Sequence, residues 1–198
     1  MPKIIRLTTV ISAVGVLALT IAACGGDDAT STESEATQML SLNGEQTVLV
    51  LDPGTAKVLA ENKVKVAPVD PASAGDEGIA FPITGGEVDS ETLAGTIDHS
   101  GGLEFSAGKT NVALTDFVVD TAAGTLTATT PDGAKLVTLD LDLAGLDRAE
   151  EEDGTIVASG IVASLTKDAA AALNDAFSVD LFKGGLTIGD VTITATAD

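Results

Sequence analysis

Cysteine, histidine and the larger aromatic residues are scarce in this 198-residue chain, which contains one cysteine, one histidine, no tyrosine and no tryptophan. A lone cysteine cannot form a disulfide within the chain, so stability must come from the hydrophobic core. Phenylalanine supplies all of the aromatic content, which is 3% of the residues. The tyrosine and tryptophan rings on which sugars and single-stranded nucleic acids usually stack are therefore absent.

Basic residues are also scarce, because 10 lysines and arginines stand against 30 aspartates and glutamates, for a formal net charge of −20. So acidic a surface repels phosphate backbones and anionic lipid head groups, which excludes nucleic acid as a partner. Hydrophobic residues nevertheless make up 44% of the chain, and the mean hydropathy is +0.33. These values indicate a folded acidic domain rather than a disordered polyanion.

The signatures of common catalytic sites are missing as well. The sequence has no Gly-x-Ser-x-Gly elbow, no Gly-x-x-x-x-Gly-Lys phosphate loop and no Gly-x-Gly-x-x-Gly that opens a helix. With a single histidine, a zinc site would need mostly carboxylates, which is unusual. Asp147 and the acidic run 150–153 could bind calcium weakly, although a solvated hairpin loop is the simpler interpretation. We therefore expect neither an enzyme nor a metal site.

The first 24 residues have the parts of a bacterial export signal. Lys3 and Arg6 precede an uncharged apolar stretch, residues 7–23, which is too short to span a bilayer as a helix. The last four residues, Ile21-Ala22-Ala23-Cys24, resemble the lipobox of bacterial lipoproteins, in which the cysteine is diacylated and becomes the new N-terminus. The resemblance implies an extracytoplasmic protein held on the cell membrane by lipid on Cys24. The alternatives are an uncleaved anchor helix, or an ordinary signal with a chance cysteine nearby.

These features divide the chain into a signal peptide over 1–23, a flexible acidic tether over 24–45 and a folded domain over 46–198. The tether is small, polar and acidic, so it offers nothing to bury at helical or strand spacing. The folded domain begins with a strand–helix–strand lead-in over 46–78. In its short helix, Asp52 suits the N-cap and Pro53 the first helical position.

From residue 79 onward, apolar and polar residues alternate and predict one strand after another. Pro82 assigns 79–84 to an edge strand, and Gly101-Gly102 predicts a hairpin between 93–100 and 103–107. In the segment 137–143, the odd-numbered residues are apolar and predict one buried face. Further strands are expected at 111–120, where Phe117-Val118-Val119 indicates a bulge or burial on both faces, and at 125–129, 155–165 and 191–194.

One convincing helix interrupts these strands, at 167–177. Thr166 can cap it, and Leu165, Ala169, Leu173 and Phe177 recur at four-residue spacing along one face. About ten short strands, with turn signals about every 8 to 12 residues, are typical of a β-sandwich or barrel-like domain. We therefore expect a mainly β fold, an antiparallel β-sandwich with one or two short helices.

His99 is the one residue that could act as a ligand or a proton carrier. In a regular strand its side chain shares a face with Ile97, the apolar one. The simpler alternative is a partly buried histidine that is hydrogen-bonded to the backbone or to Asp98. His99 is kept as the candidate ligand-binding residue.

The stretch 95–128 contains the run Gly95 to Phe105, the strand Val112 to Phe117 and the closing strand Gly124-Thr125-Leu126-Thr127-Ala128. It resembles the HtaA-type domains of actinobacterial haem-uptake proteins. The resemblance implies an immunoglobulin-like β-sandwich and directs attention to haem. The family's haem-ligating tyrosine has no counterpart here, because the chain has no tyrosine. Only His99 matches a residue of haem-pocket type, so haem would need an unusual ligation.

Together these features predict a lipid-anchored lipoprotein of the cell envelope, whose non-catalytic β-sandwich binds a partner or small ligand and needs no cofactor. A haem-binding or haem-transport protein of the HtaA type is the alternative, with His99 at the haem. An envelope hydrolase is a third reading, which lacks the usual nucleophiles. Abundant Ala, Gly, Thr and Asp with few Lys is typical of high-GC actinobacteria.

Overall fold

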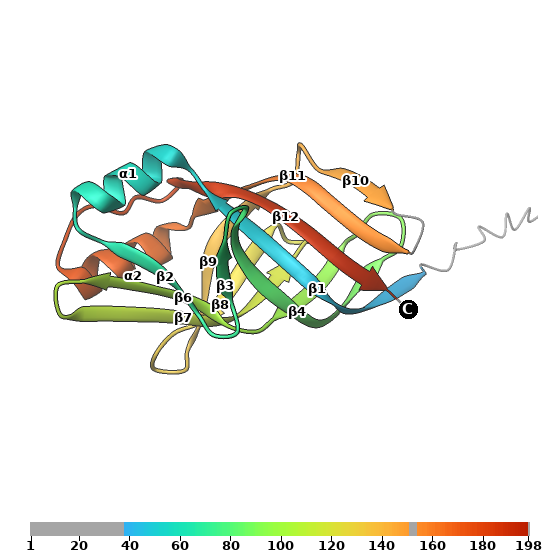
Figure 1. Cartoon of the computed structure of the whole chain (residues 1–198), viewed down its shortest axis with the longest axis horizontal. Coiled ribbons are helices and arrows are strands. Elements are labelled where there is room, and N and C mark those ends of the chain that lie inside the picture. Colours follow the sequence, from blue (N-terminus) through green and yellow to red (C-terminus); the bar gives the residue numbers. More distant parts are fainter. Residues whose placement is uncertain (1–37, 151–153, 198) are drawn as a thin grey trace, which may run out of the picture. The chain divides into compact units, whose positions relative to one another are not determined.

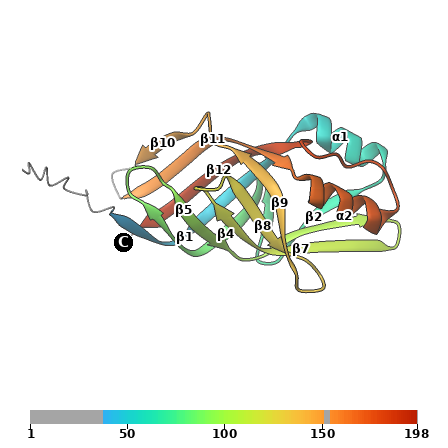
Figure 2. The same cartoon turned by 180° about the vertical axis from the view of Figure 1, so that it is seen from behind.

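The computed structural model describes residues 38–150 and 154–197, so Cys24, the expected signal peptide and most of the expected tether lie outside the described residues. The described part is mainly β-structure with two α-helices (Figures 1 and 2). Its elements are β1 (Met39–Leu51), α1 (Pro53–Glu61), β2 (Lys65–Val69), β3 (Ser73–Gly75), β4 (Gly78–Asp89), β5 (Gly95–His99), β6 (Gly102–Ala107), β7 (Thr110–Asp120), β8 (Thr125–Thr129), β9 (Lys135–Asp142), β10 (Asp147–Glu150), β11 (Thr155–Leu165), α2 (Lys167–Phe177) and β12 (Thr187–Ala197). Within the described ranges, no helix has the length and apolar character needed to cross a membrane.

Eight of these strands form a closed barrel. They follow one another in the order β7-β5-β4-β1-β12-β11-β9-β8, and β8 pairs again with β7 to close the sheet. The remaining strands extend it, with β6 and β2 beside β7, β3 beside β4, and β10 beside β11. The pairings are antiparallel. The prediction of a mainly antiparallel β fold is confirmed, but a closed barrel with extra strands replaces the expected plain sandwich.

The hairpin predicted at Gly101-Gly102 is wrong. β6 pairs with the first part of β7 and β5 with its last part, so β5 and β6 follow each other along the same neighbour. Both glycines are explained by close backbone approach instead of a hairpin turn. Gly101 has φ +82° and a Cβ there would lie 2.5 Å from the Ala72 nitrogen, while a Cβ on Gly102 would collide with the Leu114 carbonyl oxygen.

The edge strand predicted from Pro82 is also wrong, because β4 is paired on both sides. On one side it lies against β1. On the other side it pairs with β3 up to Ala80 and with β5 from Ile83 onward. Pro82 falls in the gap between these two pairings, where no ladder needs its missing N–H, and its carbonyl accepts from the Ser100 nitrogen at 3.0 Å.

The first strand begins at Met39, so residues 39–45 of the expected tether belong to β1. Leu42 is buried there, and Met39 to Ser41 pair with the end of β4. A register shift between Leu42 and Gly44, with Glu45 at φ 79°, lets the strand bend and continue against β12. Residues 147–150, which were expected in a solvated loop, likewise form β10, while 151–153 lie outside the described residues.

In β9 the predicted alternation fails at its start. Val137 is 42% exposed, whereas Thr138 is only 3% exposed and points inward. The pairing with β8 passes from Val137 opposite Thr127 to Leu139 opposite Leu126, so Thr138 is the extra residue of a bulge. From Leu139 onward the apolar residues face the core as expected, although Leu139 is only half-buried.

The two helices lie at one end of the barrel, beside β2 and the β6–β7 hairpin (Figures 1 and 2). The side chain of Asp52 accepts from the Thr55 nitrogen at 2.8 Å to cap α1, and Thr166 caps α2 through the Ala169 nitrogen, so both predicted caps are confirmed. A second hydrophobic cluster, which we call the helix cluster, lies here beside the main core of the barrel. Its buried members are Leu59, Val64, Leu165, Ala169, Ala170, Leu173 and Phe182.

Replacing Leu173 by aspartate is expected to destabilise the domain by roughly 3 kcal/mol or more, because Leu173 is 3% exposed and the new charge finds no partner in the helix cluster. Urea unfolding followed by far-UV circular dichroism measures this change. The matched control is Ala172→Asp on the exposed face of the same helix, for which we expect little change. Equal losses in both variants would show that α2 does not bury this face.

Candidate functional site

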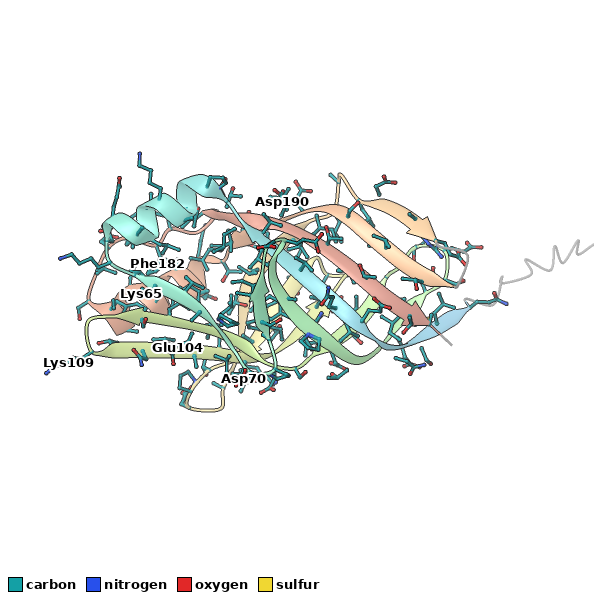
Figure 3. All side chains as sticks on the ribbon, in the orientation of Figure 1. Lys65, Asp70, Glu104, Lys109, Phe182 and Asp190 are labelled. Carbon is teal, nitrogen blue, oxygen red and sulfur yellow. The ribbon has the colours of Figure 1, made fainter. Side chains whose placement is uncertain are left out.

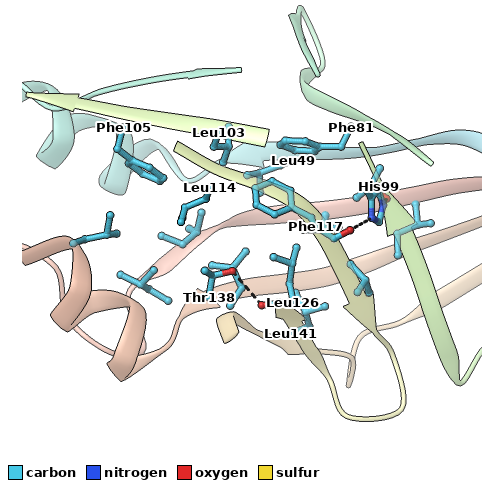
Figure 4. A pocket seen from close by; sticks show the side chains of 18 residues that line it. Leu49, Phe81, His99, Leu103, Phe105, Leu114, Phe117, Leu126, Thr138 and Leu141 are labelled. Carbon is cyan, nitrogen blue, oxygen red and sulfur yellow. Dashed lines mark hydrogen bonds between the residues drawn. The ribbon is translucent and has the colours of Figure 1, made fainter. Parts of the chain in front are cut away.

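The barrel encloses an apolar cavity of about 60 Å³ that reaches from its middle to the helix cluster (Figure 4). Strands from around the barrel contribute aliphatic side chains, and Phe81 and Phe117 add two rings in an edge-to-face pair with centroids 5.2 Å apart. In Figure 4, Phe105 and His99 lie at opposite ends of the cavity. Its polar lining residues are Thr47, His99 and Thr138.

His99 is 6% exposed and lies in the barrel wall between three strands. Its Nε2 is 2.6 Å from the hydroxyl oxygen of Thr47 on β1, and its Nδ1 is 3.2 Å from the carbonyl oxygen of Phe117 on β7. A carbonyl oxygen only accepts, so Nδ1 carries the proton and Nε2 accepts from the Thr47 hydroxyl. The neutral imidazole therefore joins β1, β5 and β7 through a chain of buried hydrogen bonds, which we call the His99 chain.

Burial lowers the pKa of His99 below its usual value of 6.5, because an imidazolium in this apolar interior loses its hydration. The hydrogen bond to Phe117 and the nearby carboxylate of Asp98 act in the opposite direction and are outweighed. A protonated His99 would also have to donate from Nε2, which requires the Thr47 hydroxyl to turn and accept. The structure therefore holds His99 in its neutral form.

A bulge in β7 helps to position the His99 chain. Asp116 has φ 49°, and the register of β7 against β8 shifts between Thr115 and Val118. Of the two alternatives expected for this strand, a bulge or burial on both faces, the structure has the bulge, next to the carbonyl that accepts from His99. Glu45 in β1, close in sequence to Thr47, marks a second such irregularity.

The remaining polar groups of the interior are satisfied by the protein itself. Thr138 donates to the carbonyl oxygen of Leu126 at 3.1 Å, so the third polar residue of the cavity has a partner. Among the described residues, no buried side-chain nitrogen or oxygen lacks a hydrogen-bond partner. The cavity therefore presents methyl, methylene and ring surface to any guest, with no free donor or acceptor aimed into it.

Two smaller cavities continue the apolar interior. One of about 20 Å³ lies beneath α1, lined by Leu59, Val66, Phe182 and their neighbours. Its one hydroxyl, that of Thr55, donates to the Thr187 carbonyl oxygen. The other, of about 50 Å³, lies toward the Leu42 and Leu93 side of the barrel. Charged side chains do not line any of the three, and Lys109 at the tip of the β6–β7 hairpin points away from the domain (Figure 3).

The Thr47–His99 pair resembles a nucleophile and its base, with the Phe117 carbonyl orienting the ring. The surroundings do not support that use. Both side chains are buried, the Thr47 hydroxyl and both ring nitrogens of His99 are already hydrogen-bonded, and the cavity that they line offers no free side-chain donor for an oxyanion. No group of three His, Cys, Asp or Glu side chains that could hold a metal ion occurs within residues 38–150 and 154–197.

Comparison with solved structures identifies this architecture. The C-terminal domain of HtaA from Corynebacterium glutamicum aligns with a TM-score of 0.61 and 15% sequence identity, over 80% of this chain and 99% of that domain. The domain has an HtaA-like fold. The N-terminal domain of the same HtaA aligns with a TM-score of 0.54 and 14% identity, over 79% of this chain and 97% of that domain. No protein-family model and no curated protein matches the sequence.

The HtaA-like interior brings together residues that are far apart in the sequence. His99 lies on the inward face with Ile97, as the alternation predicted, and its backbone partner is the carbonyl of Phe117. Thr47, its side-chain partner, lies 52 positions earlier, in a segment for which the sequence predicts a strand and no functional role. No local signal identifies that pairing, since it depends on β1 and β5 lying on either side of β4 in the closed sheet. Cys24, the predicted lipid site, lies outside the described residues.

The buried neutral His99 makes stability dependent on pH. Below about pH 6.5 the unfolded chain binds a proton at this histidine that the folded chain resists, so the free energy of unfolding falls as the pH drops. The slope from this group is at most about 1.4 kcal/mol per pH unit, and it ends at the lowered pKa of the folded state. Urea unfolding from about pH 7 to about pH 5 measures it.

The control for this experiment is His99→Gln, which keeps a neutral polar side chain and removes the titration. We expect the variant to be less stable than the unsubstituted protein near neutral pH and to depend less on pH across the same range. Parallel curves for the two proteins would mean that His99 titrates normally and is not held neutral.

Proposed function

We propose that this chain is a lipid-anchored, non-catalytic lipoprotein of the cell envelope whose barrel binds a small apolar ligand. The observation that carries the ligand proposal is the cavity itself, which has apolar walls and fully paired polar groups. Such a space does not attract water, because water there would have few hydrogen-bond partners. An apolar guest, by contrast, gains burial and packing contacts and leaves no polar group unpaired.

The proposed non-catalytic role is supported by how the Thr47–His99 pair is used. Thr47 and His99 hold three strands together, and their polar atoms in the cavity wall are already hydrogen-bonded to one another or to the backbone. A binding role uses the same residues without requiring them to move. The fold itself does not decide the matter, since one fold serves many functions.

The anchor is proposed from the sequence. Cys24 ends an export-like segment, and a diacylated cysteine would hold the domain at the extracytoplasmic face of the membrane. The strongly acidic composition supports this proposal. Anionic lipid repels an acidic domain, so the domain would need a covalent anchor to stay at the membrane. The residues between Cys24 and the start of β1 at Met39 would connect the lipid to the barrel.

Cys24→Ala is expected to prevent incorporation of labelled palmitate and to leave unprocessed precursor. Metabolic labelling followed by cell fractionation measures both effects. A matched control is Thr20→Ala in the same apolar segment, which should leave labelling and processing intact. Normal processing and membrane retention of the Cys24 variant would contradict the anchor.

Haem is the second candidate, because the fold is HtaA-like and HtaA-type domains belong to haem-uptake proteins. Two features weigh against it. The chain contains no tyrosine, and the Nε2 of His99 accepts from Thr47 inside a cavity of about 60 Å³. A porphyrin would have to open the barrel and break the His99 chain before iron could reach that nitrogen.

Xenon and haem distinguish the two candidates on the purified domain, residues 25–198. We expect xenon to show a protein-dependent chemical shift and exchange, because dry apolar cavities bind it. We expect haem to bind weakly or not at all, with any Soret change abolished in His99→Ala. Xenon magnetic resonance and absorbance titration are the measurements.

The outcome that would promote the haem candidate is tight one-to-one haem binding with a sharp Soret band that His99→Ala abolishes. Val191→Phe is the control for xenon, since Val191 lines the cavity and a larger side chain there fills it. If the xenon shift is absent from the unsubstituted protein, or is unchanged in Val191→Phe, the cavity is not a binding site.

A further inference from the structure

The central cavity and the cavity beneath α1 are separated by a shared wall of side chains. Five residues line both spaces: Leu103, Phe105, Leu165, Leu173 and Ile188. They come from β6, β11, α2 and β12, so side chains and not strand backbone divide the two spaces. Rotamer changes of such side chains could join the cavities without breaking the sheet.

The joined space would be elongated. Figure 4 shows the central cavity running from His99 at one end to Phe105 at the other. Beyond Phe105 the smaller cavity continues to Leu59 of α1 and Val66 of β2. The path therefore leads from mid-barrel to the space under the first helix, through apolar walls throughout.

The volume favours a chain over a ring. A cavity of about 60 Å³ has room for roughly four to six water-sized groups. An engineered cavity of about 150 Å³ is of the size that binds benzene, so this one is small for an aromatic ring. A row of methylene groups has a smaller cross-section and can follow an elongated space.

The chemistry of the walls points the same way. Thr47, Thr55 and Thr138 each have a hydrogen-bond partner within the protein, so the interior offers nothing to a carboxylate or a hydroxyl. A polar head group would therefore stay outside, while its hydrocarbon part enters. Helix α1 is the element at the outer end of this path, and its Val58 is 36% exposed.

We propose that the joined cavities bind one unbranched alkyl chain, of a free fatty acid or of a lipid, inserted from the α1 end with its tip near His99. The proposal rests on the proposed function, because it names the class of apolar ligand that the barrel takes. The shared wall acts as the flexible part of the site, and Leu173 of α2 and Leu165 of β11 are its most buried leucines.

The test is a calorimetric titration of the purified domain with sodium alkanoates from hexanoate to dodecanoate. Affinity should rise about threefold to fourfold for each added methylene while the chain enters the cavities, and then level off once they are filled. The length at the plateau reports how much chain is buried. Decanol and a decanoyl lysophospholipid separate the sources, since equal affinities for decanoate, decanol and this lysophospholipid mean that only the alkyl part is recognised.

Leu173→Ala enlarges both cavities at their shared wall and should move the plateau to longer chains. Leu42→Ala is the matched control, because Leu42 is buried to the same degree, at 4% exposed against 3%, and lines the cavity on the opposite side of the barrel. The plateau of this control should stay at the wild-type length. The wild-type series does not depend on either variant and decides the question if Leu173→Ala fails to fold.

Three outcomes are distinguishable. A xenon signal with flat or absent dependence on chain length overturns the alkyl-chain proposal and leaves an apolar cavity for compact guests. Tighter binding of a branched or cyclic acid than of the linear acid with the same carbon count overturns it as well. If neither xenon nor any alkanoate binds, the proposed ligand-binding function fails together with this inference.

Discussion

Pairing of β7 with β8 is the interaction on which the rest of this structure depends. β7 already contacts β5 and β6, and its pairing with β8 joins the two ends of an eight-stranded path. Closure gives each barrel strand a face that points into a common interior. It also removes the open sheet edges through which water could reach that interior. Polar groups in that interior must then be paired, which explains the chain from Thr47 through His99 to the Phe117 carbonyl.

The same closure limits what the interior can do. His99 is buried and neutral, and both of its ring nitrogens are hydrogen-bonded within the protein. Neither nitrogen is free for a ligand, so the role of this histidine in the barrel is structural. The absence of tyrosine, the modest cavity and the paired Nε2 of His99 are the observations behind our proposal of an apolar ligand instead of haem. The five side chains that line both the central cavity and the cavity beneath α1 are the ones that would have to move to admit such a guest.

Local rules succeeded where neighbouring residues decide the structure. Both helix caps and the amphipathic helix α2 were predictable, because each depends on residues within one or two helical turns. They failed at Gly101-Gly102 and Pro82, where turn and edge preferences are real but weak. Gly101 instead allows the backbone to approach Ala72 closely, and Pro82 lies in the gap between the pairings of β4 with β3 and with β5.

The sequence by itself determined the antiparallel β character, the acidic surface, the inward direction of His99 and the lack of a disulfide or a tyrosine ligand. These follow from composition and from the two-residue period of a strand. Only the tertiary structure decided that the sheet closes, that Thr138 turns inward at a bulge, and that Thr47 meets His99. Such contacts join residues many positions apart. Their energy depends on strand order and register, and neither is encoded in any short stretch of sequence.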